Sequence, residues 1–488
     1  MRKILAWSAA GVLLSACGGS SDLDVVKAAK NGEARVVVAV IDSAMNPYHE
    51  FYYAGSDIYP TAGPSSVTPA VLEEIGVPPE NVIELTRTGN ISRDKETDAD
   101  KWKKVRRGRP YWFKGTNLIG VSFSGEPYLI PSTNPEKNPH GVGTSASVLI
   151  SNPDAVILFV ETWDSLANDE SHNYAFLHPA VDFISTSYGI SIPNTGFPLP
   201  EASAFLGSFD AVVKMGKMHF SSGGNGPGLT PFRAGAGPWW SIGVSGIEEH
   251  DSEGKSILSG NFPDFVSDFT QDIPYCQDCE RGIDTGVGGT SFSTPRAAGV
   301  ASKVLLEARR ALGHGGGIRI VDGKPIMAEG NGRAITTWDL RRALEEAAWV
   351  PGIGDQTPGA DLGYPVNPAA PWLQVGWGDL SALPEKQVIA EAIAHLGFGT
   401  PTRVKPVDFC DFQTKIIEER ILFWSTAAVD AADHPAAGEF VFCGSTLPPL
   451  PAGPTPIGEG VSPPVSVHCP DQAIHPEHPV TATACSAQ

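Results

Sequence analysis

A run of hydroxyl side chains in the second half of the chain is the first candidate for chemistry. The sequence GGTSFSTP occupies residues 288–295 and contains Thr290, Ser291, Ser293 and Thr294. The alanine-rich run that follows predicts a helix, and Ser, Thr and Pro just before a helix are ordinary capping signals. Four hydroxyls exceed what a cap needs, and a serine at a helix N-terminus lies where backbone N–H groups stabilise a developing oxyanion. The stretch therefore predicts a helix start that also presents Ser291 as a candidate nucleophile.

A serine hydroxyl needs a base to take its proton, most often a histidine that is oriented by a carboxylate. Asp42 directly follows the apolar run RVVVAVI, so we expect it at the shielded carboxyl end of a strand. His140 opens the helix-like run HGVGTSASVLI beside two glycines, which would let its ring face a cleft. Both have ordinary alternatives, which are an Asp-Ser turn for Asp42 and a surface or structural role for His140.

An asparagine follows another predicted strand, in the sequence FSSGGNGP. The side-chain amide of Asn225, among glycines at a strand end, suits donation to an oxyanion, although Asn-Gly is also a common turn signal. Each of these signals is modest alone. Their joint occurrence in the order Asp42, His140, Asn225, Ser291 favours a serine nucleophile with its base and its oxyanion donor.

Continuous apolar, β-branched runs recur along the chain, and each predicts a strand buried on both faces of a parallel sheet. They occupy residues 34–41, 118–121, 155–160, 183–187, 218–221 and 240–244. Helix-like stretches follow His140 and occupy residues 202–215, 337–348 and 385–396. This alternation predicts an α/β fold with a doubly wound, mostly parallel sheet, whose ligands gather at the carboxyl ends of the strands. We expect the charged segment 93–109 to be a solvated loop.

The net charge bears on the possible partners of the chain, and the first residues bear on its location. The 488-residue chain has a formal net charge of −20, which argues against nucleic acid as a partner because phosphate binding needs surplus Lys and Arg. The start, MRKILAWSAAGVLLSAC, has basic residues and then an apolar run too short to span a bilayer. Because LSAC resembles a bacterial lipobox, we expect a signal peptide at 1–16, lipidation of Cys17 and a tether at 17–33. The chain would then be an exported, membrane-anchored lipoprotein at the periplasmic face or cell surface. The alternative is an ordinary secretory signal with an incidental cysteine.

Six cysteines follow Cys17, an even number that suggests disulfides in an exported chain. Cys276 and Cys279 form a close pair, for which a local disulfide is favoured over half of a zinc site because no second close pair exists. Beyond Gly397 the composition shifts towards proline and cysteine. We therefore expect residues 397–488 to form a small disulfide-containing appendage that is partly disordered, and its histidines are explained more simply by that tail than by a metal site.

The motifs resemble those of the subtilisin-like serine proteases (subtilases, peptidase family S8), which share this residue order. VVVAVIDSAMNPYHEF resembles the aspartate motif, with His49 at a structural histidine, and HGVGTSASVL resembles the histidine motif. SSGGNG resembles the oxyanion-asparagine motif, and GTSFSTPRAAGVAS the serine motif, which is the most specific. DFISTSYG resembles the substrate-binding strand, and TWDLRRALEEAA with GWGDLSAL the closing helix and turn. The resemblance covers residues 34–396, which we expect to form the catalytic domain.

This resemblance implies a serine endopeptidase that hydrolyses extended peptide or protein segments through an acyl-enzyme. Ser291 would be the nucleophile, His140 the general acid and base, and Asp42 the residue that orients the imidazole. Asn225 and the Ser291 backbone N–H would form the oxyanion hole. Substrate contacts are implied for Ser187, Tyr188, Gly189, Ser222, Gly223 and Gly224. No cofactor is required for this chemistry and no residue pattern indicates a metal, while structural calcium is compatible with the fold but not indicated.

Two positions beside the site depart from the family pattern. Ala44 stands where a glycine is usual, and Gly143 stands where a second histidine is usual. About twenty residues separate Cys17 from the first strand, which leaves no room for the folding propeptide of many secreted relatives. The sedolisin group is disfavoured, because it uses glutamate and aspartate where this chain has His140 and Asn225. The alternative to an enzyme is a catalytically inactive lipoprotein that binds ligands in the same groove.

Overall fold

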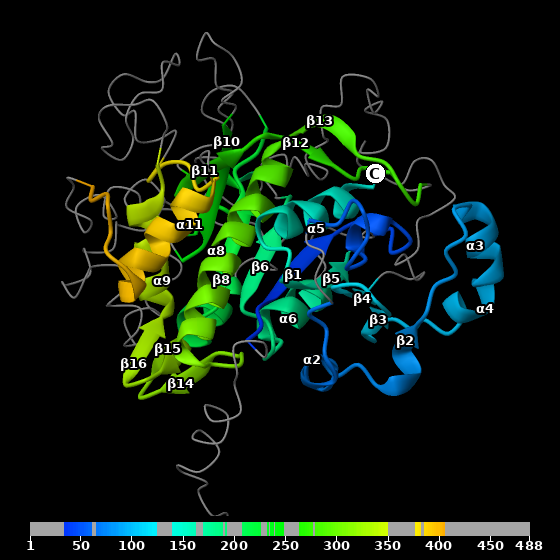
Figure 1. Ribbon diagram of the computed structural model, residues 1–488, viewed down its shortest axis with the longest axis horizontal. Coiled ribbons are helices and arrows are strands. Elements are labelled where there is room, and N and C mark those ends of the chain that lie inside the picture. Colours follow the sequence, from blue (N-terminus) through cyan, green and yellow to red (C-terminus); the bar gives the residue numbers. More distant parts are fainter. Residues whose placement is uncertain are drawn as a thin grey trace, which may run out of the picture.

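The described residues form a nine-stranded sheet at the centre of the folded structure (Figure 1). The computed structural model describes residues 34–60, 65–123, 139–162, 169–188, 191–192, 207–225, 232–233, 235–238, 240–247, 263–276, 279–349, 376–381 and 385–405. The strand order is β11-β10-β8-β6-β1-β5-β4-β3-β2, and within this sheet only β3 and β4 pair antiparallel. Strand β1 lies between β5 and β6, so the order reverses at β1. The predicted α/β fold with a doubly wound, mostly parallel sheet is confirmed.

Each predicted apolar run overlaps one strand of this sheet. The strands are β1 (Val37–Asp42), β2 (Val82–Ile83), β3 (Tyr111–Phe113), β4 (Leu118–Ser122), β5 (Val156–Glu161), β6 (Phe183–Thr186), β8 (Met218–Ser222), β10 (Ile242–Ile247) and β11 (Phe265–Asp268). Every residue of β1 is buried, as expected for a central strand that is covered on both faces. Asp42 is the last residue of β1, so the predicted position of this carboxylate at a strand end is also confirmed.

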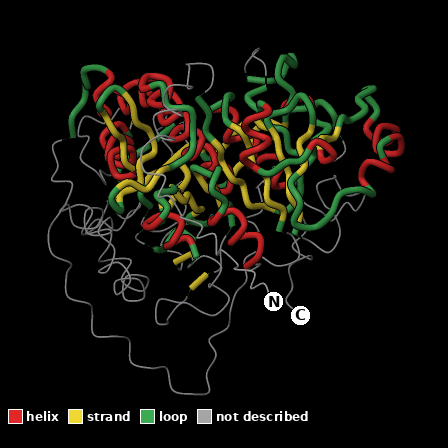
Figure 2. Tube along the Cα trace, turned by 90° about the horizontal axis from the view of Figure 1, so that it is seen from below, coloured by secondary structure: helices red, strands yellow, loops and turns green. Residues whose placement is uncertain are grey.

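Helices cover both faces of the sheet (Figure 2). One face packs against α5 (His140–Ser151) and α8 (Thr290–Leu312), and α9 (Thr337–Ala347) and α11 (Glu385–Ile393) join the same core through contacts with α8. The opposite face packs against α2 (Pro69–Ile75), α6 (Asp169–Leu177) and the short helix η4 (Asp210–Lys214). Val40 belongs to the first core and Ile41 to the second, because successive strand residues point to opposite faces. Asp42, the next residue, therefore faces α5 and α8.

The helices predicted late in the chain are present with small changes at their ends. Thr336 caps α9 through a reciprocal pair of hydrogen bonds with Asp339, one residue before the predicted start. Helix α11 continues into the short helix η5 (Ala394–Phe398), and of the stretch 202–215 the structure describes η4. None of the described helices has both the length and the apolar character needed to cross a membrane.

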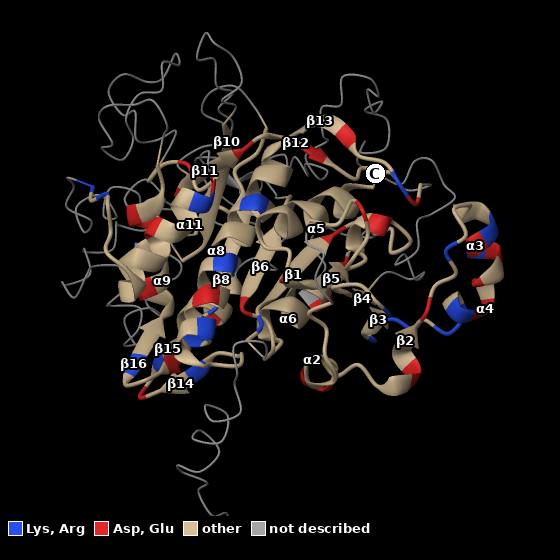
Figure 3. Ribbon diagram, viewed as in Figure 1, with Lys and Arg blue, Asp and Glu red and all other residues tan. Residues whose placement is uncertain are grey.

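The segment predicted as a solvated loop, 93–109, is largely helical over residues 93–102, so the loop prediction was wrong there. Residues 103–109 contain no helix or strand, and most side chains of the segment are exposed, as expected. It contains most of α3 (Ile91–Thr97) and all of α4 (Ala99–Trp102), and the positions of their Lys and Arg residues are coloured blue on the ribbon in Figure 3. The Trp102 indole donates to the Tyr48 hydroxyl at 2.8 Å, and that hydroxyl donates to the buried Asp98 carboxylate at 3.1 Å. The charge run conceals these buried anchors, which a composition-based interpretation does not detect.

A hairpin leads directly into the serine motif. Its strands are β12 (Thr270–Ile273) and β13 (Asp284–Gly288), and a disulfide joins Cys276 to Cys279 near its tip, as predicted. The Asn46 side-chain amide donates to the backbone carbonyls of both cysteines, at 3.1 and 2.8 Å. The hairpin tip is thereby attached to the segment that follows β1. The other small sheets are β14 (Arg319–Val321) with β15 (Lys324–Gly330) and β16 (Arg333–Thr336), and β7 (Ser191–Ile192) with β9 (Phe232–Arg233).

The same tip carries Glu280, a carboxyl group that is 7% exposed and shares a hydrogen bond with the buried Asp94 of α3. Burial, and then this neighbouring acid, raise the pKa of Glu280 to about 7. Because the folded state holds a proton that the unfolded chain releases near pH 4.5, this contribution to stability is complete below pH 4.5. It is lost as the pH rises towards 7.

Glu280→Gln should therefore remove a pH dependence of stability. Between pH 4.5 and 8 we expect the unfolding free energy of the wild-type protein to fall by roughly 1 kcal/mol relative to the variant, after allowing for solvent screening. Urea unfolding of both proteins at several pH values measures this difference. Parallel pH profiles for the two proteins would contradict the shared proton.

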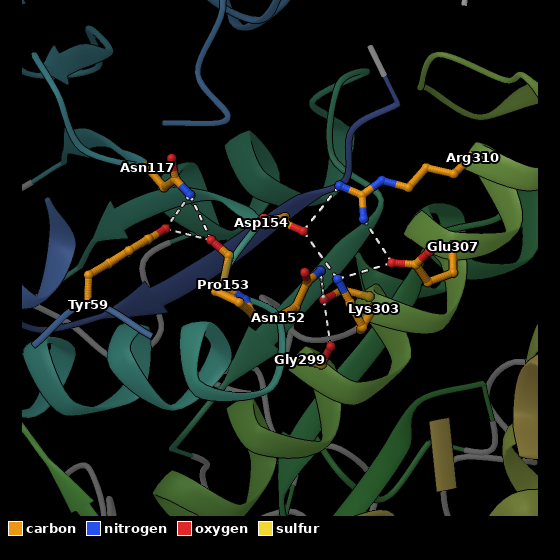
Figure 4. A network of polar contacts seen from close by, with 10 residues as sticks. Tyr59, Asn117, Asn152, Pro153, Asp154, Gly299, Lys303, Glu307 and Arg310 are labelled. Carbon is orange, nitrogen blue, oxygen red and sulfur yellow. Dashed lines mark hydrogen bonds and ion pairs between the residues drawn. The ribbon is translucent and has the colours of Figure 1, made fainter. Parts of the chain in front are cut away.

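Helices α5 and α8 are fixed against each other at the end opposite the candidate site (Figure 4). A Cβ atom at Gly299 would lie 2.6 Å from the Val148 carbonyl oxygen, so only glycine allows the helices to cross this closely. Asp154, which follows α5, forms ion pairs with Lys303 and Arg310 of α8, each at 3.1 Å. These contacts hold the two helices whose first turns contain His140 and Ser291.

Several predictions fall on residues outside the described ranges. They are the signal peptide, the lipidation of Cys17, the tether, the substrate contact of Gly189, and the cysteines and histidines beyond residue 405. The proposed domain boundaries likewise stay predictions.

Within 397–405, the backbone N–H groups of Thr402 and Arg403 donate to the Glu391 carboxylate of α11 at 2.6 and 2.7 Å.

Candidate active site

Asp42 and His140, 98 positions apart in sequence, lie in direct contact. The imidazole Nδ1 is 2.8 Å from Asp42 Oδ1 and 2.9 Å from Oδ2, and both side chains are fully buried. A carboxylate accepts hydrogen bonds only, so it stabilises the tautomer that carries the proton on Nδ1. The lone pair is then on Nε2, which is buried and has no hydrogen-bond partner among the described residues. The structure therefore places an imidazole with one nitrogen held by a carboxylate at this strand end.

A glycine allows His140 to approach the strand. A Cβ atom at Gly141 would lie 2.4 Å from the Ala44 carbonyl oxygen and 2.7 Å from the Phe159 ring, distances that no side chain tolerates. The first turn of α5 can therefore pack directly on the segment after β1. The backbone carbonyl of Ala44 therefore lies against the first turn of α5.

Ser291 lies in the first turn of α8. Its Oγ donates to the backbone carbonyl of Ser187 at 2.9 Å, and Ser187 Oγ donates to the Ser291 carbonyl at 2.7 Å. The neighbouring ring of Phe292 lies 5.5 Å from the His140 ring, centroid to centroid. The serine stretch and the histidine are therefore adjacent, although the described hydrogen bond of the serine hydroxyl points to Ser187 and not to His140 Nε2.

The predicted helix start differs from the observed one. Helix α8 begins at Thr290, so Pro295 lies inside the helix rather than at its first turn, and no side chain of the run caps the N-terminus. Pro295 has no N–H to give to the carbonyl four residues earlier, which belongs to Ser291. Ser187 Oγ satisfies that carbonyl instead. The proline thus allows the hydrogen bond from Ser187 Oγ to the Ser291 carbonyl.

Asn225 is held by the first residue of α8. Its Oδ1 accepts from the Thr290 backbone N at 2.8 Å and from Thr290 Oγ1 at 3.0 Å, while the Gly224 N–H donates to the same hydroxyl at 3.2 Å. With the oxygen fixed, Nδ2 is the end of the amide that remains as a donor. A Cβ atom at Gly289 would lie 3.3 Å from this nitrogen, so glycine keeps the space in front of it open. The role of Thr290 in orienting this amide was not predicted from the sequence.

Of the predicted substrate-contact residues that the structure describes, Ser222 ends β8 and the others follow β6 or β8. Ser187 contacts Ser291 directly. Tyr188 directs its hydroxyl to His172 Nε2 at 2.9 Å and is fully buried on the α6 face. Burial, and then the negative charge of Asp42, hold the pKa of Tyr188 well above its usual value, so the phenol stays neutral. The Gly223 N–H donates to the Val244 carbonyl at 2.8 Å, and Ser222 Oγ is buried without a partner in the described part of the chain.

Gly143, the position at which the resemblance led us to expect a second histidine, lies in an aromatic environment. A Cβ atom there would lie 2.7 Å from the Phe292 ring, 3.0 Å from Ile273 and 3.1 Å from the Tyr275 ring. Tyr275 in turn packs edge-on against Phe292, with ring centroids 5.8 Å apart. The space beside Gly143 is therefore filled by Phe292, Ile273 and Tyr275, which leaves no room for a side chain at this position.

Gly143→Ala should destabilise the protein, although alanine usually stabilises a helix by about 0.5–1 kcal/mol over glycine. The added methyl collides with the Phe292 ring, and overpacking typically costs about 1–3 kcal/mol. We expect a net loss of about 1 kcal/mol in urea unfolding, with partial recovery when Phe292→Leu is added to relieve the contact. An increase in stability for Gly143→Ala alone would show that the aromatic pair does not fill this space.

Among the described residues, no group of three or more His, Cys, Asp or Glu is arranged to hold a metal ion.

Comparison with known proteins finds similarity only among solved structures. No model of a protein family matches the sequence, and no curated protein matches it. A lanthipeptide protease is 15% identical, with 74% of this chain and 89% of that chain covered and a TM-score of 0.40. The prenylagaramide maturation protease PagA is 16% identical, with 78% and 99% covered and a TM-score of 0.40. Sphericase is 18% identical over 40% of this chain and 61% of its own, with a TM-score of 0.28. At such low values the likeness does not assign a family.

Proposed function

We propose that this chain is a serine endopeptidase that hydrolyses extended peptide segments through an acyl-enzyme. The observation that supports this best is the buried pair of Asp42 and His140. In the part of the chain that the structure describes, His140 Nε2 has no partner, and the His140 ring lies 5.5 Å from that of Phe292, the residue after Ser291. A buried imidazole with one nitrogen held by a carboxylate and the other vacant suits a general base.

The proposed reaction begins when Ser291 Oγ exchanges its hydrogen bond from the Ser187 carbonyl to His140 Nε2. The hydroxyl oxygen attacks the substrate carbonyl carbon as its proton passes to Nε2, and Asp42 stabilises the resulting imidazolium. The amide Nδ2 of Asn225 donates to the oxyanion of the tetrahedral intermediate, the step at which such a donor contributes most.

Collapse of this first intermediate breaks the C–N bond, and the imidazolium gives its proton to the leaving amine. The product amine departs, and Ser291 remains as an ester of the acyl half. Water then attacks this ester and gives a proton to His140 Nε2, and collapse of the second intermediate releases the acid and restores the serine hydroxyl.

Reaction of the purified wild-type protein with a fluorophosphonate probe tests this proposal. We expect one covalent adduct per molecule, located on Ser291 by mass spectrometry of the peptides, together with cleavage of a peptide library. A folded protein that neither reacts nor cleaves would instead support the alternative, a ligand-binding lipoprotein without catalytic activity.

A further inference from the structure

Thr144 is a residue of α5 that the family motifs do not assign to the chemistry, yet its hydroxyl contacts the Asp42 carboxylate. The distance from Thr144 Oγ1 to Asp42 Oδ2 is 2.9 Å, and Thr144 is fully buried. Its other acceptor within reach is the Gly141 carbonyl at 3.3 Å. The hydroxyl has one proton, and the shorter contact with the charged acceptor is the stronger one.

The two carboxylate oxygens of Asp42 are held from different elements. Oδ1 accepts from the Ser43 backbone N at 2.7 Å and lies 3.2 Å from Ser43 Oγ, so the strand end itself fixes this oxygen. Oδ2 has Thr144 as its donor apart from the shared imidazole Nδ1. Without Thr144, Oδ2 would keep the imidazole Nδ1 as its one described contact, so the plane of the carboxylate would be fixed less firmly, through Oδ1 alone.

The spacing on α5 makes this contact possible. His140 and Thr144 are four residues apart, so they lie on the same face of the helix, one turn from each other. The glycine at position 141 brings that face against the end of β1. One helix face therefore supplies both the base and a second donor to the same carboxylate.

We propose that Thr144 is a positioning residue, which fixes the plane of the Asp42 carboxylate so that the His140 ring is held with Nε2 directed to Ser291. This inference rests on the proposed peptidase function. It assigns Thr144 no contact with substrate, and its effect on catalysis acts through Asp42 and His140.

Thr144→Val and Thr144→Ser test the proposal, because valine keeps the volume without the hydroxyl and serine keeps the hydroxyl. With a fluorogenic peptide that the wild-type protein cleaves, we expect kcat to fall about tenfold for Thr144→Val with KM unchanged. Thr144→Ser should stay within about twofold to threefold of the wild-type kcat, because the hydroxyl is restored. The matched control is Ser147→Ala, since Ser147 Oγ is buried on the same helix but donates only to the Gly143 carbonyl at 3.0 Å. It should lose a similar amount of stability and keep its kcat.

The outcome that overturns the proposal is an unchanged kcat for Thr144→Val, or an equal loss of kcat in Thr144→Ser or in Ser147→Ala. A second readout separates this from failure of the proposed function. The proton on His140 Nδ1, hydrogen-bonded to a carboxylate, should give a downfield proton resonance in NMR spectra whether or not the protein hydrolyses peptides. A shift or broadening of this resonance in Thr144→Val but not in Thr144→Ser supports the positioning role, and an identical resonance in all three proteins excludes it.

Discussion

Ser291→Ala is expected to abolish peptide hydrolysis and fluorophosphonate labelling while the protein stays folded. Removal of the nucleophile from such a triad typically lowers kcat on the order of 10⁶-fold, because the base and the oxyanion donor then have no alkoxide to form or stabilise. The cost in stability should be small, about 1 kcal/mol, because the variant loses one described hydrogen bond, from Ser291 Oγ to the Ser187 carbonyl.

Ser293→Ala is the matched control for this prediction. Ser293 is a buried hydroxyl of the same helical turn, and its Oγ donates to backbone carbonyls of Asp268 and Gly289, at 3.2 and 3.4 Å. It should therefore lose stability to a similar extent but keep labelling and hydrolysis. Steady-state hydrolysis, intact-mass analysis of the adduct and thermal unfolding measure these effects. Residual wild-type activity in Ser291→Ala would place the nucleophile elsewhere and refute the proposed function.

The sequence patterns were sufficient to predict the sheet and the position of Asp42 at a strand end. Apolar runs longer than four residues specify strands that are buried on both faces, and parallel strands bring their carboxyl ends to one edge. A polar residue directly after such a run must therefore lie at that edge. This argument predicts the position of Asp42 at the end of β1, whereas its contact with His140, 98 positions away, was implied by the resemblance of the two motifs.

The start of α8 shows where local patterns mislead. Ser, Thr and Pro in GGTSFSTP are capping signals, but the donor at the helix start, the Thr290 N–H, is satisfied by the Asn225 side chain, 65 positions earlier. Because the cap comes from another element, the helix begins earlier than the proline suggests. Thr144 and Phe292 were missed for a similar reason, since a contact with Asp42 or Gly143 depends on how close two helices and a strand approach.

The charged segment 93–109 was wrongly predicted over residues 93–102, for the opposite reason. Its composition is dominated by side chains that face solvent, which conceals the few positions that decide the fold. Asp98 and Trp102 are buried, and they bond to Tyr48, which precedes the segment by about fifty positions. A pattern of two anchors in such a run has no periodic signal strong enough to predict a helix pair.

Asp42→Asn is expected to lower kcat on the order of 10⁴-fold with little change in KM, the size typical of a triad aspartate. The reason is the set of donors that surrounds this carboxylate. Ser43 N and Thr144 Oγ1 each donate to one carboxylate oxygen, and His140 Nδ1 lies within 2.9 Å of both. An amide has only one oxygen, so its NH₂ group must face a donor or the imidazole.

The least costly arrangement directs the amide NH₂ towards His140 Nδ1, which must then accept a hydrogen bond. The imidazole proton moves to Nε2, and this nitrogen can no longer take the proton of Ser291. The variant should therefore fold and bind peptide but lack a base. Its unfolding free energy should fall only by about 1–3 kcal/mol, the cost of one poorly satisfied buried group.

Asp154→Asn provides the contrasting variant. Asp154 forms ion pairs with Lys303 and Arg310 between α5 and α8, far along both helices from the candidate site (Figure 4). Losing these partly exposed pairs should cost up to about 1 kcal/mol of stability and leave kcat unchanged. Measured kcat, KM and urea unfolding for both variants separate the two roles of a carboxylate. Equal kcat values for Asp42→Asn and Asp154→Asn would show that the buried contact with His140 is structural, because a histidine that acts as base cannot lose its tautomer without losing the reaction.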